Sequence, residues 1–246
     1  MIQSLFTVTE NVCLAKNIWR MRLQGDTSAI TAPGQFVNIK LEGFFLRRPI
    51  SVNDVEGDIL TLIYKPLGEG TRQMTTFQPG KVLDILTGLG NGFDPALSGE
   101  KPLLVGGGVG IPPLYNLCKR LIAKGAKPTV VLGFNKKDEV FLESDFRALG
   151  AEVLPLTADG SYGEKGLVTD GVNMVQDYTF LYTCGPEAML KAVYAVCKTS
   201  GQFSFEERMG CGFGACMGCS CKTVTGNKRI CKEGPVLTKE DIIWEA

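Results

Sequence analysis

The chain has 246 residues, of which 44% are hydrophobic and 21% are charged, which is the composition of a globular protein with room for one to three domains. Lysine plus arginine and aspartate plus glutamate each number 26, and this balance argues against binding to nucleic acid or to an anionic membrane. Histidine is absent, which removes the commonest general base and a common zinc ligand. The composition therefore disfavours a hydrolase and is compatible with the movement of electrons.

The N-terminal residues lack the apolar run and cleavage site of an export signal, and no stretch approaches the length of a membrane span. We therefore expect a cytoplasmic protein without a membrane segment. Under those conditions the nine cysteines favour metal or thiol chemistry over a disulfide scaffold.

The first part of the chain, residues 1–97, consists of short alternating segments separated by glycine and proline. Such a pattern is typical of a small antiparallel β-barrel. The expected strands lie within residues 7–23, 34–41, 47–55, 58–66 and 81–90.

Residues 98–202 change to a β-α-β pattern, which predicts a parallel sheet in an α/β domain. Short apolar strands are expected within residues 101–108, 127–134, 151–156 and 179–183, and amphipathic helices within residues 111–125 and 185–201. Cys118 and Cys197 lie on the apolar faces of these helices, and Cys13 lies in a barrel strand. We expect these three thiols to be buried as small apolar side chains.

A glycine loop, "VGGGVGIPP", follows the first of these strands and opens the first helix. Backbone N–H groups and a helix dipole in such a loop can face a phosphate group, although a simple tight turn is the alternative. The loop departs from the usual dinucleotide fingerprint because Pro113 stands where a third glycine is expected.

Polar groups at the ends of barrel strands suggest a second anion site. "RRPISV" offers Arg47, Arg48 and Ser51, and "YKPLGEGT" adds a lysine, glycines and a threonine. Arginine can bind a pyrophosphate through two hydrogen bonds, but a solvated basic turn and a plain hairpin loop are the alternatives. In the α/β domain, Cys184 of "CGP" falls at the edge of the sheet where ligands bind.

The third part, residues 203–246, is rich in glycine and cysteine. Cys211, Cys216 and Cys219 have the C-x4-C-x2-C spacing of plant-type [2Fe–2S] proteins, which take a distant fourth cysteine. Cys231 is the expected fourth ligand, because a hairpin that turns at Gly226–Asn227 returns it to the loop, whereas Cys221 lies too close to Cys219. A zinc site and a redox C-x-x-C pair are the alternatives.

Six segments, taken together and in order, resemble the ferredoxin-NADP reductase superfamily. Within it, they are similar to the electron-transfer subunits of the class B, NAD-dependent dihydroorotate dehydrogenases. The segments are "RRPISV", "YKPLGEGT", "GLGNGF", "GGGVGIPPL", "CGPEAML" and "ERMGCGFGACMGCSCK".

The resemblance implies an FAD-binding β-barrel domain (1–97), a Rossmann-like NAD-binding α/β domain (98–202) and a [2Fe–2S] domain (203–246). It implies [2Fe–2S] ligation by the four cysteines named above. The residues implied for FAD are Arg48, Pro49, Ile50, Ser51, Ile63, Tyr64, Lys65, Gly70 and Thr71, and those for NAD are Gly107, Gly108, Gly110, Cys184 and Gly185.

The resemblance also implies a partner. An FMN-containing catalytic subunit would oxidise dihydroorotate in pyrimidine biosynthesis, and two copies of each subunit would form a heterotetramer. No catalytic residue is expected in this chain, because the cofactors carry the chemistry. The alternatives are the NAD(P)H:acceptor reductase component of another iron–sulfur flavoenzyme and a non-enzymatic zinc-stabilised module.

Overall fold

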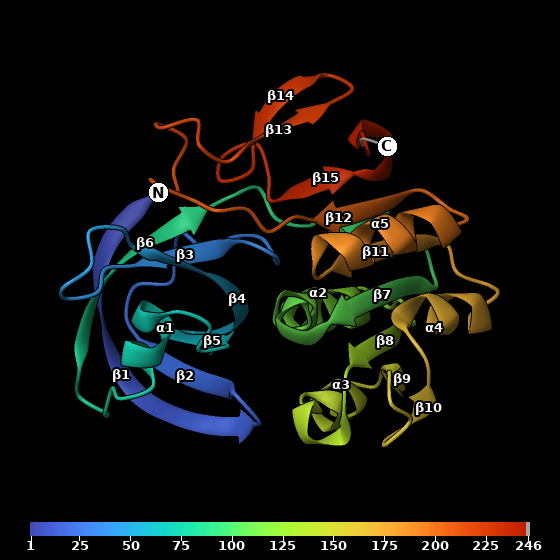
Figure 1. The fold of residues 1–246 in the computed structure, drawn as a ribbon, viewed down its shortest axis with the longest axis horizontal. Helices are drawn as coiled ribbons and strands as arrows, with labels where there is room; N and C mark the ends of the chain where they lie inside the picture. The colour runs from blue at the N-terminus through green and yellow to red at the C-terminus, as the bar shows by residue number, and fades with distance from the viewer. Residues whose placement is uncertain (245–246) are drawn as a thin grey trace.

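The computed structural model describes residues 1–244 and shows three parts. A closed barrel lies on the left of Figure 1, a seven-stranded sheet with helices lies on the right, and the C-terminal segment lies above both. The predicted multidomain architecture is confirmed. The last two positions of the predicted third domain, 245 and 246, lie outside the described residues.

The barrel is antiparallel, with strand order β1-β2-β5-β4-β3-β6. Alternate residues of its strands, such as Phe6, Met21 and Leu62, point inward and are buried. The strands are β1 (Ile2–Ala15), β2 (Ile18–Gln24), β3 (Phe36–Ile39), β4 (Arg48–Glu56), β5 (Ile59–Tyr64) and β6 (Val82–Leu89). A short helix, α1 (Glu69–Met74), was not predicted; its first turn is closed by a hydrogen bond from Gly68 N to Thr71 Oγ1 (3.1 Å), and Met74 is buried in the barrel.

The sheet of the second part has the order β10-β9-β8-β7-β11-β12-β15 and is parallel except at β15. Its strands are β7 (Pro102–Gly107), β8 (Thr129–Phe134), β9 (Glu152–Thr157), β10 (Glu164–Lys165), β11 (Phe180–Cys184), β12 (Gly201–Ser204) and β15 (Val236–Thr238). Four helices accompany it: α2 (Pro112–Ala123), α3 (Glu143–Ala148), α4 (Val168–Met174) and α5 (Glu187–Val196). Four short 3-10 turns complete the chain: Pro95–Leu97, Gly108–Gly110, Lys137–Glu139 and Lys239–Asp241.

The sheet is covered on both faces. Leu104 packs with α2 and α3, whereas its neighbour Leu103 packs with α4 and α5, as alternation along a buried strand requires. None of the helices in the described part of the chain has the length and apolar character of a membrane span.

The three cysteines expected to be buried divide into two groups. Cys118 and Cys197 are buried as predicted, although α5 ends one residue before Cys197. Cys13 is exposed, so that expectation was wrong. It does lie in a strand, opposite Trp19 in the pair of β1 and β2, but its side chain is on the outer surface of the barrel.

The C-terminal segment contains a small hairpin, β13 (Ser220–Thr223) and β14 (Gly226–Arg229). Thr223 pairs with Gly226, so the turn is at residues 224–225 and not at Gly226–Asn227 as predicted. After the hairpin, β15 pairs with β12 and joins the sheet. The predicted boundary between residues 202 and 203 falls within β12, so the second and third parts share one sheet.

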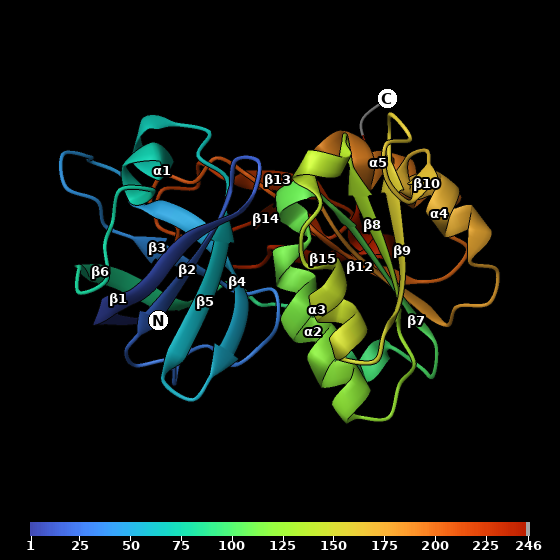
Figure 2. The same cartoon turned by 90° about the horizontal axis from the view of Figure 1, so that it is seen from below.

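The barrel and the sheet meet through α2, which packs against β4 (Figure 2). Asp54 of β4 is buried there and accepts hydrogen bonds from Asn116 Nδ2 (2.6 Å) and Lys119 Nζ (2.8 Å). Lys119 also bonds Glu56 Oε1 (2.8 Å), and Arg120 Nη1 donates to the carbonyl of Thr31 (2.8 Å). Ile18 and Ile63 of the barrel share an apolar cluster with Leu114 of α2, so the contact combines apolar packing with these paired polar groups.

We expect Asp54→Ala to destabilise the protein by about 1–3 kcal/mol, because Asn116 would be left buried without its acceptor. Urea unfolding followed by fluorescence measures the change. Asp177→Ala is the control, since the Lys101–Asp177 ion pair is exposed at both ends and its loss should leave the unfolding midpoint unchanged. Equal midpoints for the Asp54 variant and the unaltered protein would contradict this account of the interface.

Candidate functional site

A cavity of about 380 Å³ opens between the barrel and the sheet. Its barrel side is formed by β4, β5 and the start of α1. Every residue that the resemblance implied for FAD lines it, together with Cys184 from the sheet: Arg48, Pro49, Ile50, Ser51, Ile63, Tyr64, Lys65, Gly70 and Thr71. Motifs that are separate in the sequence therefore meet at one place.

The Arg48 side chain has a prepared position in this cavity. Its guanidinium carbon lies over the Phe44 ring, 4.6 Å from the ring centroid. A Cβ on Gly70 would lie 2.4 Å from Arg48 Nε, so only glycine leaves room for the arginine. A cation beside the first turn of a helix is suited to a diphosphate, and this arrangement fits the FAD that the sequence predicts.

A second cavity, of about 540 Å³, lies at the carboxyl ends of the parallel strands. Gly107 and Gly108 line it, as expected for residues that approach a dinucleotide. Gly110 and Gly185 do not line it. A Cβ on Gly110 would lie 2.3 Å from the carbonyl oxygen of Cys184, so this glycine allows the loop to pack against β11.

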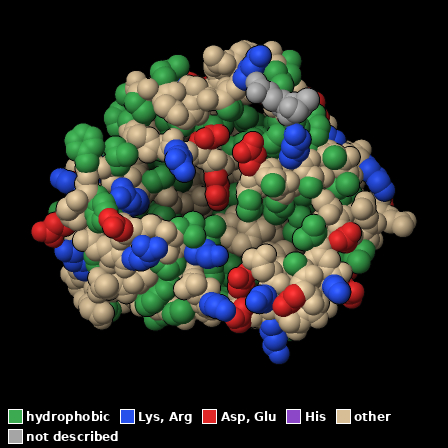
Figure 3. Space-filling view, viewed as in Figure 1, with side chains coloured by type: hydrophobic (Ala, Val, Ile, Leu, Met, Phe, Trp, Pro, Cys, Tyr) green, Lys and Arg blue, Asp and Glu red, His purple; other side chains and the backbone are tan. Residues whose placement is uncertain are grey.

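The two cavities share part of their walls. Lys65, Leu67, Val109 and Glu206 line both, so ligands bound in the two cavities would be neighbours. The junction contains a group that the sequence analysis missed, Glu206. Surrounding protein raises its pKa, although solvent in the cleft reaches its side chain. Figure 3 shows acidic side chains gathered at the hollow near the centre of this face.

Cys184 lines the first cavity and not the second, although the resemblance implied a contact with NAD. Burial raises the pKa of its thiol to about 12, so it is a neutral thiol at physiological pH. Its strand neighbour Ser204 also lines the first cavity. The position of Glu206 just after β12, at the carboxyl edge of the sheet, was the signal that could have found it.

The cysteine loop brings its thiols together in two pairs. The pKa of the Cys211 thiol is lowered in part by its neighbour Cys216, and that of Cys231 is raised in part by its neighbour Cys219. The carbonyl of Cys219 accepts from Ile230 N (3.1 Å), and Cys219 Sγ accepts from Cys231 N (3.4 Å). The hairpin thus returns Cys231 to the loop.

The local electrostatics of the two pairs differ. Burial opposes ionisation of Cys211, but N–H groups of residues 213, 215 and 216 lower the pKa of its thiol to about 6. Burial and contact with Cys219 raise the pKa of Cys231 to about 12. No three cysteine or carboxylate side chains in the described chain converge on one point suited to a single metal ion. Two pairs of thiols fit a group with two irons, each taking two thiolates.

Cys221 lies apart from these pairs. It borders a separate cavity of about 300 Å³ with Glu207 and Trp244, and burial raises its pKa. It lies in β13 opposite Lys228, two residues beyond Cys219.

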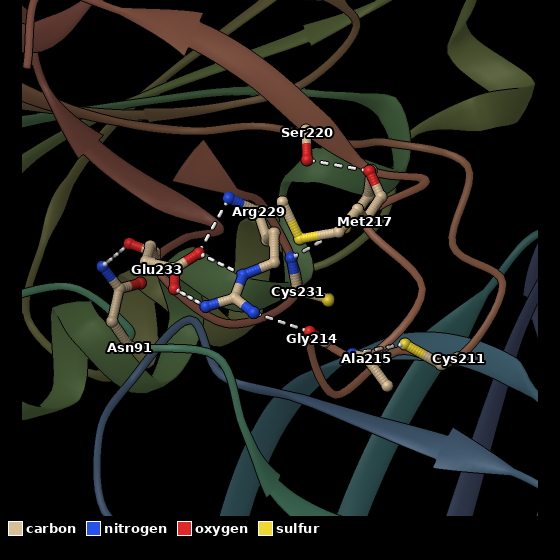
Figure 4. A network of polar contacts seen from close by, with 10 residues as sticks. Asn91, Cys211, Gly214, Ala215, Met217, Ser220, Arg229, Cys231 and Glu233 are labelled. Atoms are coloured by element: carbon tan, nitrogen blue, oxygen red, sulfur yellow. Dashed lines mark hydrogen bonds and ion pairs between the residues drawn. The ribbon is translucent and has the colours of Figure 1, made fainter. Parts of the chain in front are cut away.

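Polar contacts attach the loop to its surroundings (Figure 4). Asn91, from the barrel side, donates to the carbonyls of Glu233 (3.1 Å) and Val236 (2.8 Å). Asn38 of β3 donates to the carbonyl of Cys211 (3.1 Å). Met209 and Pro235, at the two ends of the loop, line the first cavity. The thiol pairs are therefore held beside that cavity by both the barrel and the sheet.

Comparison with known proteins identifies the family to which this chain belongs. The sequence model of the iron-sulfur cluster binding domain of dihydroorotate dehydrogenase B matches residues 206–243, and that of the oxidoreductase NAD-binding domain matches residues 104–195. A protein of Fusobacterium nucleatum subsp. nucleatum named dihydroorotate dehydrogenase B (NAD(+)), electron transfer subunit, is 42% identical over 251 residues, or 96% of each chain. This chain belongs to the dihydroorotate dehydrogenase B electron transfer subunit family.

Further relatives agree with this membership. An electron transfer subunit of the same name from Bacillus cereus (strain G9842) is 44% identical over 245 residues, which are 94% of each chain. A solved NADH-dependent reduced ferredoxin-NADP oxidoreductase superposes with a TM-score of 0.88 at 27% identity, covering 97% of this chain and 90% of that one. A ferredoxin NADP+ reductase from Neisseria gonorrhoeae shares the fold, with a TM-score of 0.67 at 16% identity over 79% of this chain and 89% of its own. The resemblance seen in the sequence is confirmed.

We expect Gly110→Ala to destabilise this electron transfer subunit by about 1–3 kcal/mol, because the added Cβ would press against the Cys184 backbone. The thermal unfolding midpoint measures the effect. Gly68→Ala is the control, since a Cβ there meets nothing within 4 Å and its φ is −123°. The close-packing role would be refuted if both variants unfolded at the same temperature.

Proposed function

We propose that this chain carries electrons from dihydroorotate oxidation, on a partner catalytic subunit, to NAD in pyrimidine biosynthesis. One observation carries the proposal: the two cavities share a wall, and the thiol pairs lie beside the first cavity. Oxidation of dihydroorotate to orotate releases two electrons and two protons, and NAD accepts two electrons and one proton as a hydride. A chain that holds three redox sites in a row suits this transfer.

The barrel residues would hold FAD in the first cavity. Arg48 would bind its diphosphate, Ser51 and the backbone of β5 would face the flavin ring, and Gly70 and Thr71 would complete the phosphate site. When bound, FAD supplies the exchange of either one or two electrons. The common wall at Val109 and Glu206 would place the flavin beside a ligand bound in the second cavity.

The loop and the hairpin would hold the [2Fe–2S] cluster through Cys211, Cys216, Cys219 and Cys231. Gly107 and Gly108 would face the NAD diphosphate, with Gly110 and Gly185 packing the loop from behind. We extend the proposal to a partner that contains FMN and to an assembly with two copies of each subunit, both of which the family resemblance supports.

The ligand set predicts opposite outcomes for two neighbouring cysteines. Cys231→Ser should lose or badly destabilise the cluster, because Cys231 closes the second thiol pair. Cys221→Ser should keep the full complement of iron and inorganic sulfide, because Cys221 borders a different cavity. Iron and sulfide analysis with EPR of the reduced protein measures both. A cluster absent from the Cys221 variant and normal in the Cys231 variant would reverse the assignment.

The proposal places dihydroorotate oxidation on the partner and NAD binding on this chain. It therefore predicts how the isolated chain responds to NADH and to dihydroorotate. NADH should bleach the bound flavin without a partner, because both cavities belong to this chain. Dihydroorotate alone should leave the flavin oxidised until the catalytic subunit is added. Stopped-flow absorbance under anaerobic conditions follows both reactions. Reduction of the isolated chain by dihydroorotate would place the catalytic site here and overturn the proposal.

A further inference from the structure

Arg229, at the end of β14, has a side chain that is only 24% exposed. Each of its three guanidinium nitrogens donates a hydrogen bond. Glu233 accepts hydrogen bonds from the Arg229 backbone N (2.8 Å), from its Nε (2.9 Å) and from its Nη2. The remaining terminal nitrogen, Nη1, donates to the carbonyl oxygen of Gly214 (2.7 Å). Arg229 therefore connects the hairpin to the centre of the cysteine loop (Figure 4).

The Gly214 carbonyl belongs to the same peptide group as the N–H of Ala215. That N–H donates to Cys211 Sγ at 3.2 Å. The oxygen of this planar peptide thus accepts a charge-assisted hydrogen bond from Arg229. The nitrogen of the same peptide donates a hydrogen bond to the Cys211 thiol. Hydrogen bonds in such a chain polarise one another, so the guanidinium strengthens the N–H···S contact and fixes its direction.

The charge of Arg229 also lies close to the second thiol pair. Arg229 stands two residues before Cys231, and the intervening Ile230 N donates to the carbonyl of Cys219 (3.1 Å). An iron–sulfur cluster gains one negative charge when it is reduced, and hydrogen bonds to its sulfurs help to set its potential. A nearby cation and a strengthened N–H···S bond both favour the reduced form, whereas the carboxylate of Glu233 opposes it.

We propose that Arg229 is a positioning residue that raises the reduction potential of the cluster, acting through the Gly214–Ala215 peptide and through its own charge. This inference rests on the proposed ligation by Cys211, Cys216, Cys219 and Cys231. The carboxylate of Glu233, which pairs with Arg229, opposes this rise in potential. The reduction potential of the cluster therefore depends on the balance between the two charges.

The test is an EPR-monitored redox titration of the complex with its catalytic subunit. At a fixed potential near the midpoint, Arg229→Gln should lower the ratio of reduced to oxidised cluster about tenfold, which is about 59 mV for a one-electron couple. Glu233→Gln should raise the ratio, because it removes the opposing charge and keeps an oxygen acceptor. The Fe–S stretching bands of Arg229→Gln should also lose part of their sensitivity to deuterium exchange, since the N–H···S bond is weakened.

Lys228→Gln is the matched control. Lys228 is the neighbouring cation on the same strand, but its Nζ pairs with Asp241 (2.7 Å) away from the thiol pairs. Its loss should change the ratio less than about twofold, because Lys228 pairs with Asp241 and has no hydrogen bond to the Gly214–Ala215 peptide. A Lys228 effect as large as that of Arg229 would overturn the proposal, as would an Arg229→Gln protein with an intact cluster and an unchanged potential.

Two further outcomes are decided by the same experiment. If Arg229→Gln assembles no cluster, Glu233→Gln settles the question: a raised potential supports the proposal and an unchanged one overturns it. If the unaltered chain itself holds no [2Fe–2S] cluster, the ligand assignment fails and the role of Arg229 falls with it, whereas a normal cluster with no response to Arg229 contradicts only the present inference.

Discussion

Asp54 connects the two halves of the electron path, because its carboxylate binds a helix of the opposite domain. The strand that carries Asp54, β4, begins at Arg48 and forms the floor of the first cavity. The helix that it binds, α2, begins just after the glycine loop of the second cavity. The hydrogen bonds to Asn116 and Lys119 therefore join the two elements whose ends face the two ligands. The common wall of the cavities depends on this contact.

The C-terminal segment adds the third site without forming a separate body. Asn38 and Asn91 attach it to the barrel, while β15 attaches it to the sheet. Its position is thus fixed by both domains at once, and a shift of either domain would also move the thiol pairs. Electron transfer needs redox groups at constant separation, and this attachment supplies it with ordinary backbone and amide hydrogen bonds.

Features that depend on local patterns could be predicted from the sequence. The barrel strands follow from alternation, the first helix of the α/β domain from its apolar face, and the iron-sulfur binding domain from the C-x4-C-x2-C spacing. Features that depend on tertiary contacts could not. The place of Glu206 between two cavities depends on residues from both domains, and the packing role of Gly110 depends on the carbonyl of Cys184 seventy-four positions away. Arg229 has the sequence appearance of a solvated hairpin cation, and only the fold brings Gly214 to it.

The ends of the seven-stranded sheet determine how this chain can associate with others. One edge strand, β10, has two residues, both charged and exposed, and the other, β15, has three. The barrel is closed and has no edge of its own. Long exposed edges invite strand addition by other chains, and the described part of this chain offers none. The short, charged β10 and the three-residue β15 thus leave little free backbone at which another chain could add a strand.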